Sequence, residues 1–350
     1  MSKNKENKTP ADPRCGIVGG QAVLEGVMMK SHERCSLAVR TPEGKIAVDN
    51  SIFVSLRKKH KVCDLPIIRG CVGMVEQLKL SMDMLTKSAE MQGVDLDEPE
   101  TKFEKWLLEK CGDKLMPIIS AIGMVLGLAL GVGLFLLLPT FGAKGLDFLT
   151  GGFIGKYALL RSFVEGLIRM ALFVGYVWGV SFMPDIRRTY EYHGAEHKSV
   201  ACFEAGMELT PENARKCTRF HPRCGTSFIF VMLILSIVIN SFLTWDNVWI
   251  RFGSKILILP LIVGLGYEFI RYAGGHSNPF TKIVSAPGLW MQRITTKEPT
   301  LEQIEVAIHA LKCSMPEEFP DYTPPTPIED VAEDTEKAVA ETESTDNEQA

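Results

Sequence analysis

Residues 1–14 lack an apolar run and consist mostly of polar and charged side chains. A secretory signal needs an apolar core of about 7–15 residues. The sequence therefore predicts that no cleaved signal precedes the body of the chain and that its first long apolar segment is a true membrane anchor. The nine cysteines also lack the even number and regular spacing of a disulfide framework. We expect thiols that are free or metal-bound, on a reducing cytoplasmic face.

Basic side chains are not interleaved with aromatic ones in any motif typical of nucleic-acid binding, so no nucleic-acid partner is expected. Acidic residues gather at the end of the chain, where residues 314–350 are rich first in proline and then in acid, with Lys337 as the one basic side chain. Such composition predicts disorder. The rest of the chain is net positive, which suits a protein that lies against anionic lipid.

Long apolar runs, by contrast, are present. A helix of about 20 apolar residues crosses the hydrocarbon core of a bilayer. Four segments meet or approach this requirement, at residues 115–138, 166–183, 226–243 and 256–270. Lysine and arginine are most frequent before the first segment and between the second and third, so the positive-inside rule places both termini and the middle loop in the cytoplasm. We predict a multi-pass protein of the cell membrane, with the lipid bilayer as its partner.

Two charges fall within or beside the second apolar segment. Glu165 and Arg169 are four residues apart, so they can pair on one helical face. The alternative is an ion pathway, to which Glu268 in the fourth segment could also contribute. Glycines at four-residue intervals in the first segment favour close helix packing, which is compatible with a homo-oligomer.

The only clear strand pattern lies near the amino terminus. Residues 36–40 and 45–49 flank a Thr-Pro-Glu-Gly turn, which predicts a β-hairpin. Apolar spacing predicts a helix over residues 70–91, and Thr300 is a candidate N-cap for another over residues 301–311.

The fold class is mainly α, integral membrane, with about four transmembrane helices and a small α+β cytoplasmic portion. The expected order is a tail (1–14), a cytoplasmic α+β region (15–114, with a helix at 102–111), transmembrane helices (115–183), a cytoplasmic His/Cys loop (184–225), transmembrane helices (226–272), interfacial helices (273–313) and a disordered tail (314–350).

The segment His193-Gly-Ala-Glu-His197 has the H-x-x-E-H spacing of an inverted zinc-protease helix. At about 100° per residue, the two imidazoles share one helical face and Glu196 lies beside them. Two neutral imidazoles can hold a divalent metal, and a neighbouring carboxylate can take a proton from water. The alternative is a solvated polar helix in which the pattern arose by chance.

A second cluster follows about twenty residues later, in a short basic loop with proline and glycine. His221 and Cys224 have the spacing to converge on one centre, and both residue types are preferred zinc ligands. The alternative is that the thiols of Cys217 and Cys224 in this loop pack as small apolar groups. We predict a divalent metal site for zinc, built from His193, His197, His221 and Cys224.

Four motifs together resemble the YqhQ-like family of bacterial multi-pass membrane proteins. They are Gly19-Gly-Gln-Ala-Val-Leu-Glu-Gly-Val-Met-Met29, Tyr192-His-Gly-Ala-Glu-His-Lys198, His221-Pro-Arg-Cys-Gly-Thr-Ser-Phe228 and Pro287-Gly-Leu-Trp-Met-Gln-Arg-Ile-Thr-Thr296. The family's function is unknown, and its His and Cys motifs have led to its description as metal-dependent enzymes. The resemblance implies functional positions at Gln21, Glu25, His193, Glu196, His197, His221, Arg223 and Cys224. The acidic tail lies outside the family pattern.

Three functions follow from these expectations. The first is a membrane-embedded metal-dependent enzyme, a hydrolase with its site on the cytoplasmic face, in which Glu196 acts as general base. Glu25 gains a catalytic role if the glycine-rich loop around it folds over the histidines, and otherwise forms a loop cap or salt bridge. The second is a non-catalytic scaffold with a structural metal site, and the third is a small transporter or ion pathway.

Overall fold

The computed structural model describes residues 14, 16–93, 123, 125–127, 129–242, 248–275 and 278–325. They form two compact units, each assembled from separate stretches of the chain. Among these residues, the first unit contains residues 14, 16–54, 188–221 and 296–325, and the second contains those that fall within 55–187 and 222–295.

An antiparallel sheet of four strands in the order β1-β2-β3-β4 forms one side of the first unit. Its strands are β1 (Val18–Val23), β2 (Gly26–Ser31), β3 (Arg34–Arg40) and β4 (Ile46–Ile52). The predicted hairpin is confirmed as β3 and β4, whose register pairs Arg40 with Ile46. The sheet is larger than expected, because β1 and β2 form a second hairpin. The strand β2 is buried at Val27, Met28 and Met29 in succession, so it lacks the polar alternation that reveals a half-exposed strand.

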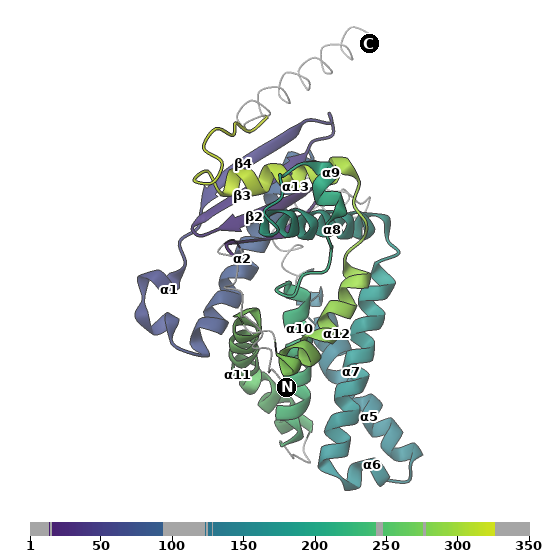
Figure 1. Cartoon of the computed structure of the whole chain (residues 1–350). Helices are drawn as coiled ribbons and strands as arrows, with labels where there is room; N and C mark the ends of the chain where they lie inside the picture. Colours follow the sequence, from purple (N-terminus) through teal and green to yellow (C-terminus); the bar gives the residue numbers. More distant parts are fainter. Residues whose placement is uncertain are drawn as a thin grey trace, which may run out of the picture. The chain divides into compact units, whose positions relative to one another are not determined.

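Helices α8 (Pro184–Glu204), α9 (Pro211–Lys216) and α13 (Leu301–Ser314) complete the first unit. Helix α13 lies across β2, β3 and β4 (Figure 1). Its residues Ile304, Ala307 and Leu311 are fully buried in the core of this unit. The sequence predicted that α13 lies at the membrane interface. In the structure, its apolar face instead covers the sheet. Its predicted N-cap is confirmed, because Thr300 and Gln303 form a reciprocal capping box.

The chain continues in an ordered form beyond α13. Met315 is buried, Phe319 packs against the core, and Tyr322 contacts His309. The prediction of disorder from residue 314 is therefore wrong for residues 315–322, because their apolar side chains cover part of the core. Residues 326–350 and the tail at residues 1–13 lie outside the described part.

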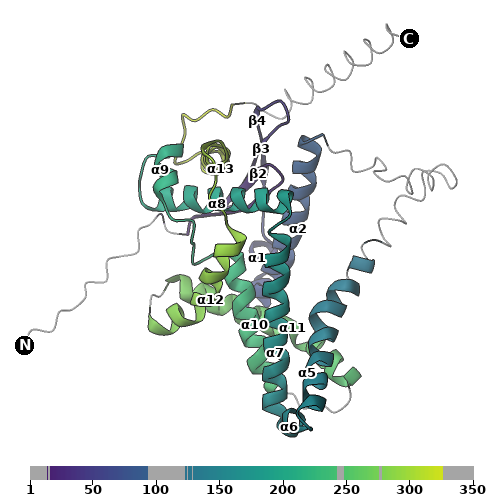
Figure 2. The same ribbon diagram turned by 90° about the vertical axis from the view of Figure 1, so that its right-hand side faces the viewer.

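The second unit is helical. It contains α1 (Leu56–Lys59), η1 (Lys61–Asp64), α2 (Ile68–Met91), the π-helical turn η3 (Gly133–Leu137), α5 (Leu138–Leu149), α6 (Phe153–Lys156), α7 (Ala158–Val180), α10 (Gly225–Ser241), α11 (Val248–Gly275) and α12 (Pro279–Thr295). Helix α10 packs against both α7 and α11 (Figure 2). The predicted helix at residues 70–91 is confirmed as α2.

Within the described residues, three helices are long and apolar enough to cross a membrane, at Val125–Leu149, Ala158–Val180 and Gly253–Ala273. The segment expected to form the third of four spans is α10, which is apolar but has only 17 residues. The first span extends to Leu149 rather than ending at residue 138, because the helix continues through Pro139. Residues 115–122 and the helix predicted at residues 102–111 lie outside the described part.

The charges of the second unit form ion pairs. Arg169 Nη2 lies 3.2 Å from Glu165 Oε1, which confirms the predicted pair. Lys255 also contacts Glu165. The Thr140 hydroxyl donates a hydrogen bond to Glu165 Oε1 at 2.9 Å. Glu268 does not join them, because it accepts a hydrogen bond from Arg69 Nε at 2.6 Å. Partners of this kind explain how ionisable groups persist among apolar helices.

Candidate metal centre

Helix α8 carries His193, Glu196 and His197, and a close backbone contact fixes its position. Lys297 donates its N–H to the Tyr190 carbonyl at 2.8 Å. A Cβ atom at Gly194 would lie 2.0 Å from the Lys297 carbonyl oxygen. The glycine inside the His-Gly-Ala-Glu-His motif is therefore required by packing, since any side chain there would push α8 away.

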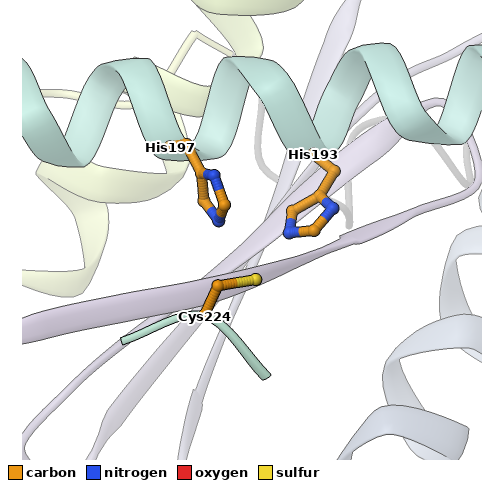
Figure 3. A group of neighbouring side chains, drawn as sticks. All are labelled: His193, His197 and Cys224. Atoms are coloured by element: carbon orange, nitrogen blue, oxygen red, sulfur yellow. The ribbon is translucent and has the colours of Figure 1, made fainter. Parts of the chain in front are cut away.

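Three potential ligands converge below this helix. One ligand atom from each of His193, His197 and Cys224 lies within 4.8 Å of the other two. Both imidazoles project from one side of α8 toward the Cys224 sulfur (Figure 3), and their ring centroids are 4.4 Å apart. The group could hold a single ion, although metal–ligand bonds of about 2.0–2.3 Å would bring tetrahedral ligand atoms to roughly 3–4 Å from one another.

The protonation of His197 is set by a backbone carbonyl. Its Nδ1 lies 2.5 Å from the Arg219 carbonyl oxygen. A carbonyl only accepts, so Nδ1 carries the proton and the Nε2 lone pair is left for a metal. Metal-binding histidines commonly donate their second nitrogen in this way, which fixes the tautomer and the ring orientation. His197 is also 2% exposed, so its ring has little freedom to turn.

The loop that supplies this carbonyl is held by Lys198. Its buried ammonium donates to the carbonyls of Arg215 at 2.7 Å and Cys217 at 3.0 Å. It also pairs with Glu298 at 2.7 Å. A buried cation is stable only when its donors are satisfied. Lys198 thus ties α8 to the loop that orients the adjacent His197.

His221 lies next to the three converging ligands but is not one of them. Its ring centroid is 5.6 Å from that of His197. Its Nε2 lies 3.6 Å from Glu204 Oε2, and Glu204 also accepts the Gly16 N–H at 2.9 Å. Cys224, three residues later, lies with His193 and His197 instead.

Glu196 is buried beside the histidines. Its Oε2 lies 3.4 Å from His197 Nε2, the nitrogen that faces away from Arg219. Its Oε1 accepts the backbone N–H of Gly20 in β1 at 3.1 Å. One oxygen is thereby fixed by the sheet, while the other points to the region where His197 would bind a metal.

Glu25 is held by groups outside this cluster. It sits in the β1–β2 turn with φ of 50°. Its carboxylate is bridged by Arg188, with Nη2 at 2.6 Å, and accepts the Tyr192 hydroxyl at 3.1 Å. Burial, followed by the charge of Glu25, raises the pKa of Tyr192, so this phenol remains a donor. These contacts favour the salt-bridge interpretation of Glu25 and give it a part in holding α8.

Comparison with known proteins identifies the family of this chain. The family model "Protein of unknown function (DUF1385)" matches residues 65–317. The chain belongs to this family. It is also 33% identical over 298 residues to "Uncharacterized protein YqhQ" of Bacillus subtilis (strain 168), a match that covers 83% of this chain and 90% of that protein. No solved structure matches. The expected resemblance is thus confirmed, and the DUF1385 assignment leaves the activity to be inferred from the site.

Several residues of the centre had no signal in the sequence. Arg219 and Lys297 contribute backbone groups, which every residue carries, so a pattern of side chains cannot reveal their roles. Lys198 resembles any basic residue of a solvated helix. Gly20 had a partial signal, because a pair of glycines in a strand often marks a close approach of another group.

Proposed function

We propose that this DUF1385 protein is a membrane-embedded metal-dependent hydrolase whose site faces the cytoplasm. The metal, zinc, would be held by His193, His197 and Cys224. The hydrogen bond from His197 Nδ1 to the Arg219 carbonyl carries the proposal, because it presents Nε2 in the form that binds a cation. Two nitrogens and one sulfur suit zinc better than the oxygen-preferring magnesium or calcium.

The residues around these ligands have the roles that hydrolysis needs. A zinc ion held by His193, His197 and Cys224 would supply Lewis-acid chemistry toward a water molecule in the site. Glu196 Oε2, 3.4 Å from His197 Nε2, is placed to accept the proton of that water and return it to a leaving group. The Gly20 N–H holds the other Glu196 oxygen and orients the carboxylate.

His221 supports a second candidate, a structural metal site in a non-catalytic scaffold. Its ring is 5.6 Å from that of His197, so a turn away from Glu204 would bring a fourth ligand and close the site. We favour hydrolysis, because a closed site gives no role to Glu196 Oε2, the oxygen that Gly20 does not bind.

The first test is the metal content of the detergent-purified protein, measured by mass spectrometry. We expect about one zinc per chain, and its loss in a His193→Ala, His197→Ala variant that keeps the wild-type unfolding temperature. A His32→Ala, His60→Ala variant is the matched control, since it removes two histidines from other parts of the chain. Equal, negligible metal in all three proteins would contradict the proposal.

The second test separates catalysis from structure. Glu196→Gln keeps the shape of the side chain and removes its basicity. Under our proposal this variant retains zinc, and its rate of hydrolysis on a panel of amide and ester substrates is at least about 100-fold lower than that of the wild type. A structural site predicts that the zinc-loaded wild type hydrolyses no member of the panel and that His221→Ala releases the metal.

A further inference from the structure

Strand β1 is at the edge of the sheet and runs beside the proposed catalytic carboxylate. Its register with β2 pairs Val23 with Gly26, Gln21 with Met28 and Gly19 with Lys30. In an antiparallel pair, alternate residues direct their N–H and C=O groups toward the partner strand. A turn of two residues closes this hairpin, so Val23, Gln21 and Gly19 are the residues bonded to β2.

It follows that the backbone groups of Val18, Gly20 and Ala22 face away from the sheet. The Gly20 N–H confirms this direction, because it donates to Glu196 on α8 at 3.1 Å. Among the described residues, no hydrogen bond engages the outward groups of Val18 or Ala22. The edge therefore offers donors and acceptors on both sides of the point where Glu196 approaches it.

The two glycines of β1 keep this edge open. Gly19 and Gly20 are exposed and have no side chains to shield the backbone. A Cβ at Gly20 would lie 3.1 Å from Glu196 Cγ and 2.4 Å from the Met28 carbonyl oxygen. Position 20 therefore accepts only glycine, and the carboxylate reaches the strand directly.

We propose that the edge of β1 binds the substrate as an extended peptide segment, so that the hydrolase is a peptidase. This inference rests on the function proposed above. An extended peptide alternates donors and acceptors with the spacing of a strand, and it gains affinity by adding to a sheet edge. A lipid or small ester lacks that row of groups. Pairing with Val18 and Ala22 places an intervening peptide bond beside Glu196 and the metal ligands.

The reaction consumes one water. Its oxygen forms a bond to the carbonyl carbon of the peptide, and the carbon–nitrogen bond breaks. Glu196 Oε2 takes one proton from the water and delivers it to the departing nitrogen. The second proton of the water passes from the new carboxylic acid to the amine, so the products are a carboxylate and an ammonium group, and Glu196 returns to its starting state.

The test uses the full chain loaded with zinc and a set of unstructured, internally quenched peptides of about ten residues. Ala22→Pro removes the outward N–H and leaves the ladder to β2 intact, since edge positions tolerate proline. Asn50→Pro is the matched control, because it removes an outward N–H at an exposed position of β4, the opposite edge of the sheet. We expect Ala22→Pro to lower kcat/KM at least about tenfold with unchanged zinc content, and Asn50→Pro to stay within about twofold of the wild type.

Peptide probes with N-methylated backbones make the test independent of how well a variant folds. Methylation at alternate positions that face β1 should weaken binding to the wild type at least about tenfold, whereas methylation at the intervening positions should have little effect. Equal binding of both sets would overturn the inference. So would a zinc-loaded protein that hydrolyses small esters and leaves all peptides intact. Absence of zinc would instead contradict the proposed function itself.

Discussion

At His197 and Glu196, neighbouring backbone groups set the chemistry of side chains. The Arg219 carbonyl selects the tautomer of His197, and the Gly20 N–H fixes one oxygen of Glu196. The motif spacing predicted correctly that His193 and His197 share a helical face, because helix geometry alone determines it. It could not choose between His221 and Cys224 as the third ligand, since this choice depends on the path of a loop with proline and glycine.

The first residue-scale prediction concerns Gly194. An alanine there places its Cβ 2.0 Å from the Lys297 carbonyl oxygen, so α8 must move. We expect Gly194→Ala to lower the free energy of unfolding by about 1–3 kcal/mol and to weaken zinc binding. Competition with a chelator and chemical denaturation measure these two effects.

Gly175→Ala in α7 is the control, because its Cβ would meet no atom within 4 Å. If Gly194→Ala binds zinc as tightly as the control and is equally stable, the close packing of α8 on Lys297 is wrong.

The second residue-scale prediction concerns pH. Burial lowers the pKa of His309 below its ordinary value of 6.5, and the positive charges of Lys312 and Arg40 act in the same direction, against Glu305. Below pH 6.5 the unfolded chain then binds more protons than the folded chain, so stability falls as the pH drops toward the lowered pKa. Thermal unfolding at pH 7.5 and 5.5 should show a smaller pH effect in His309→Gln than in the wild type. An identical pH effect in both proteins would refute this role.

At the scale of single elements, the sequence predicted those with a strong local pattern. The β3–β4 hairpin follows from its Pro/Gly turn, α2 follows from apolar spacing, and α13 follows from the capping residue Thr300 at its start. The pairing of β1 with β2 was missed, because a glycine-rich strand next to a fully buried one has no polar alternation to reveal it. The packing of α13 on the sheet was missed as well, because an apolar helical face fits a sheet or a membrane surface equally well.

The prediction at this scale tests the start of α13. The Thr300 hydroxyl accepts the Gln303 N–H at 3.2 Å, and Gln303 Oε1 accepts the Thr300 N–H at 2.9 Å. Thr300→Ala removes one of these bonds and should cost about 1 kcal/mol of stability. Thr300→Ser retains the hydroxyl and should stay within a few tenths of a kcal/mol of the wild type. Equal losses in the two variants, measured by chemical denaturation, would show that the hydroxyl does not cap the helix.

At the scale of the whole molecule, the chain combines a small α+β unit with a helical unit that contains membrane-length helices. Composition predicted this combination, because an uncharged apolar run of about 20 residues is typical of a membrane-spanning helix. The number of spans was harder to predict, since α10 is apolar over only 17 residues. Segments far apart in the sequence, at residues 16–54, 188–221 and 296–325, build the first unit, and local patterns do not predict such pairings.

The central claim is that two histidines of α8 and Cys224 bind one metal ion, and X-ray absorption at the zinc edge tests it most directly. We predict about one sulfur ligand at about 2.3 Å and at least two nitrogen ligands at about 2.0 Å. Cys224→Ser should remove the sulfur shell, whereas Cys313→Ser, which alters a thiol outside the ligand group, should leave the spectrum unchanged. A wild-type spectrum with only light-atom ligands, or a sulfur shell that survives in Cys224→Ser, would contradict the account.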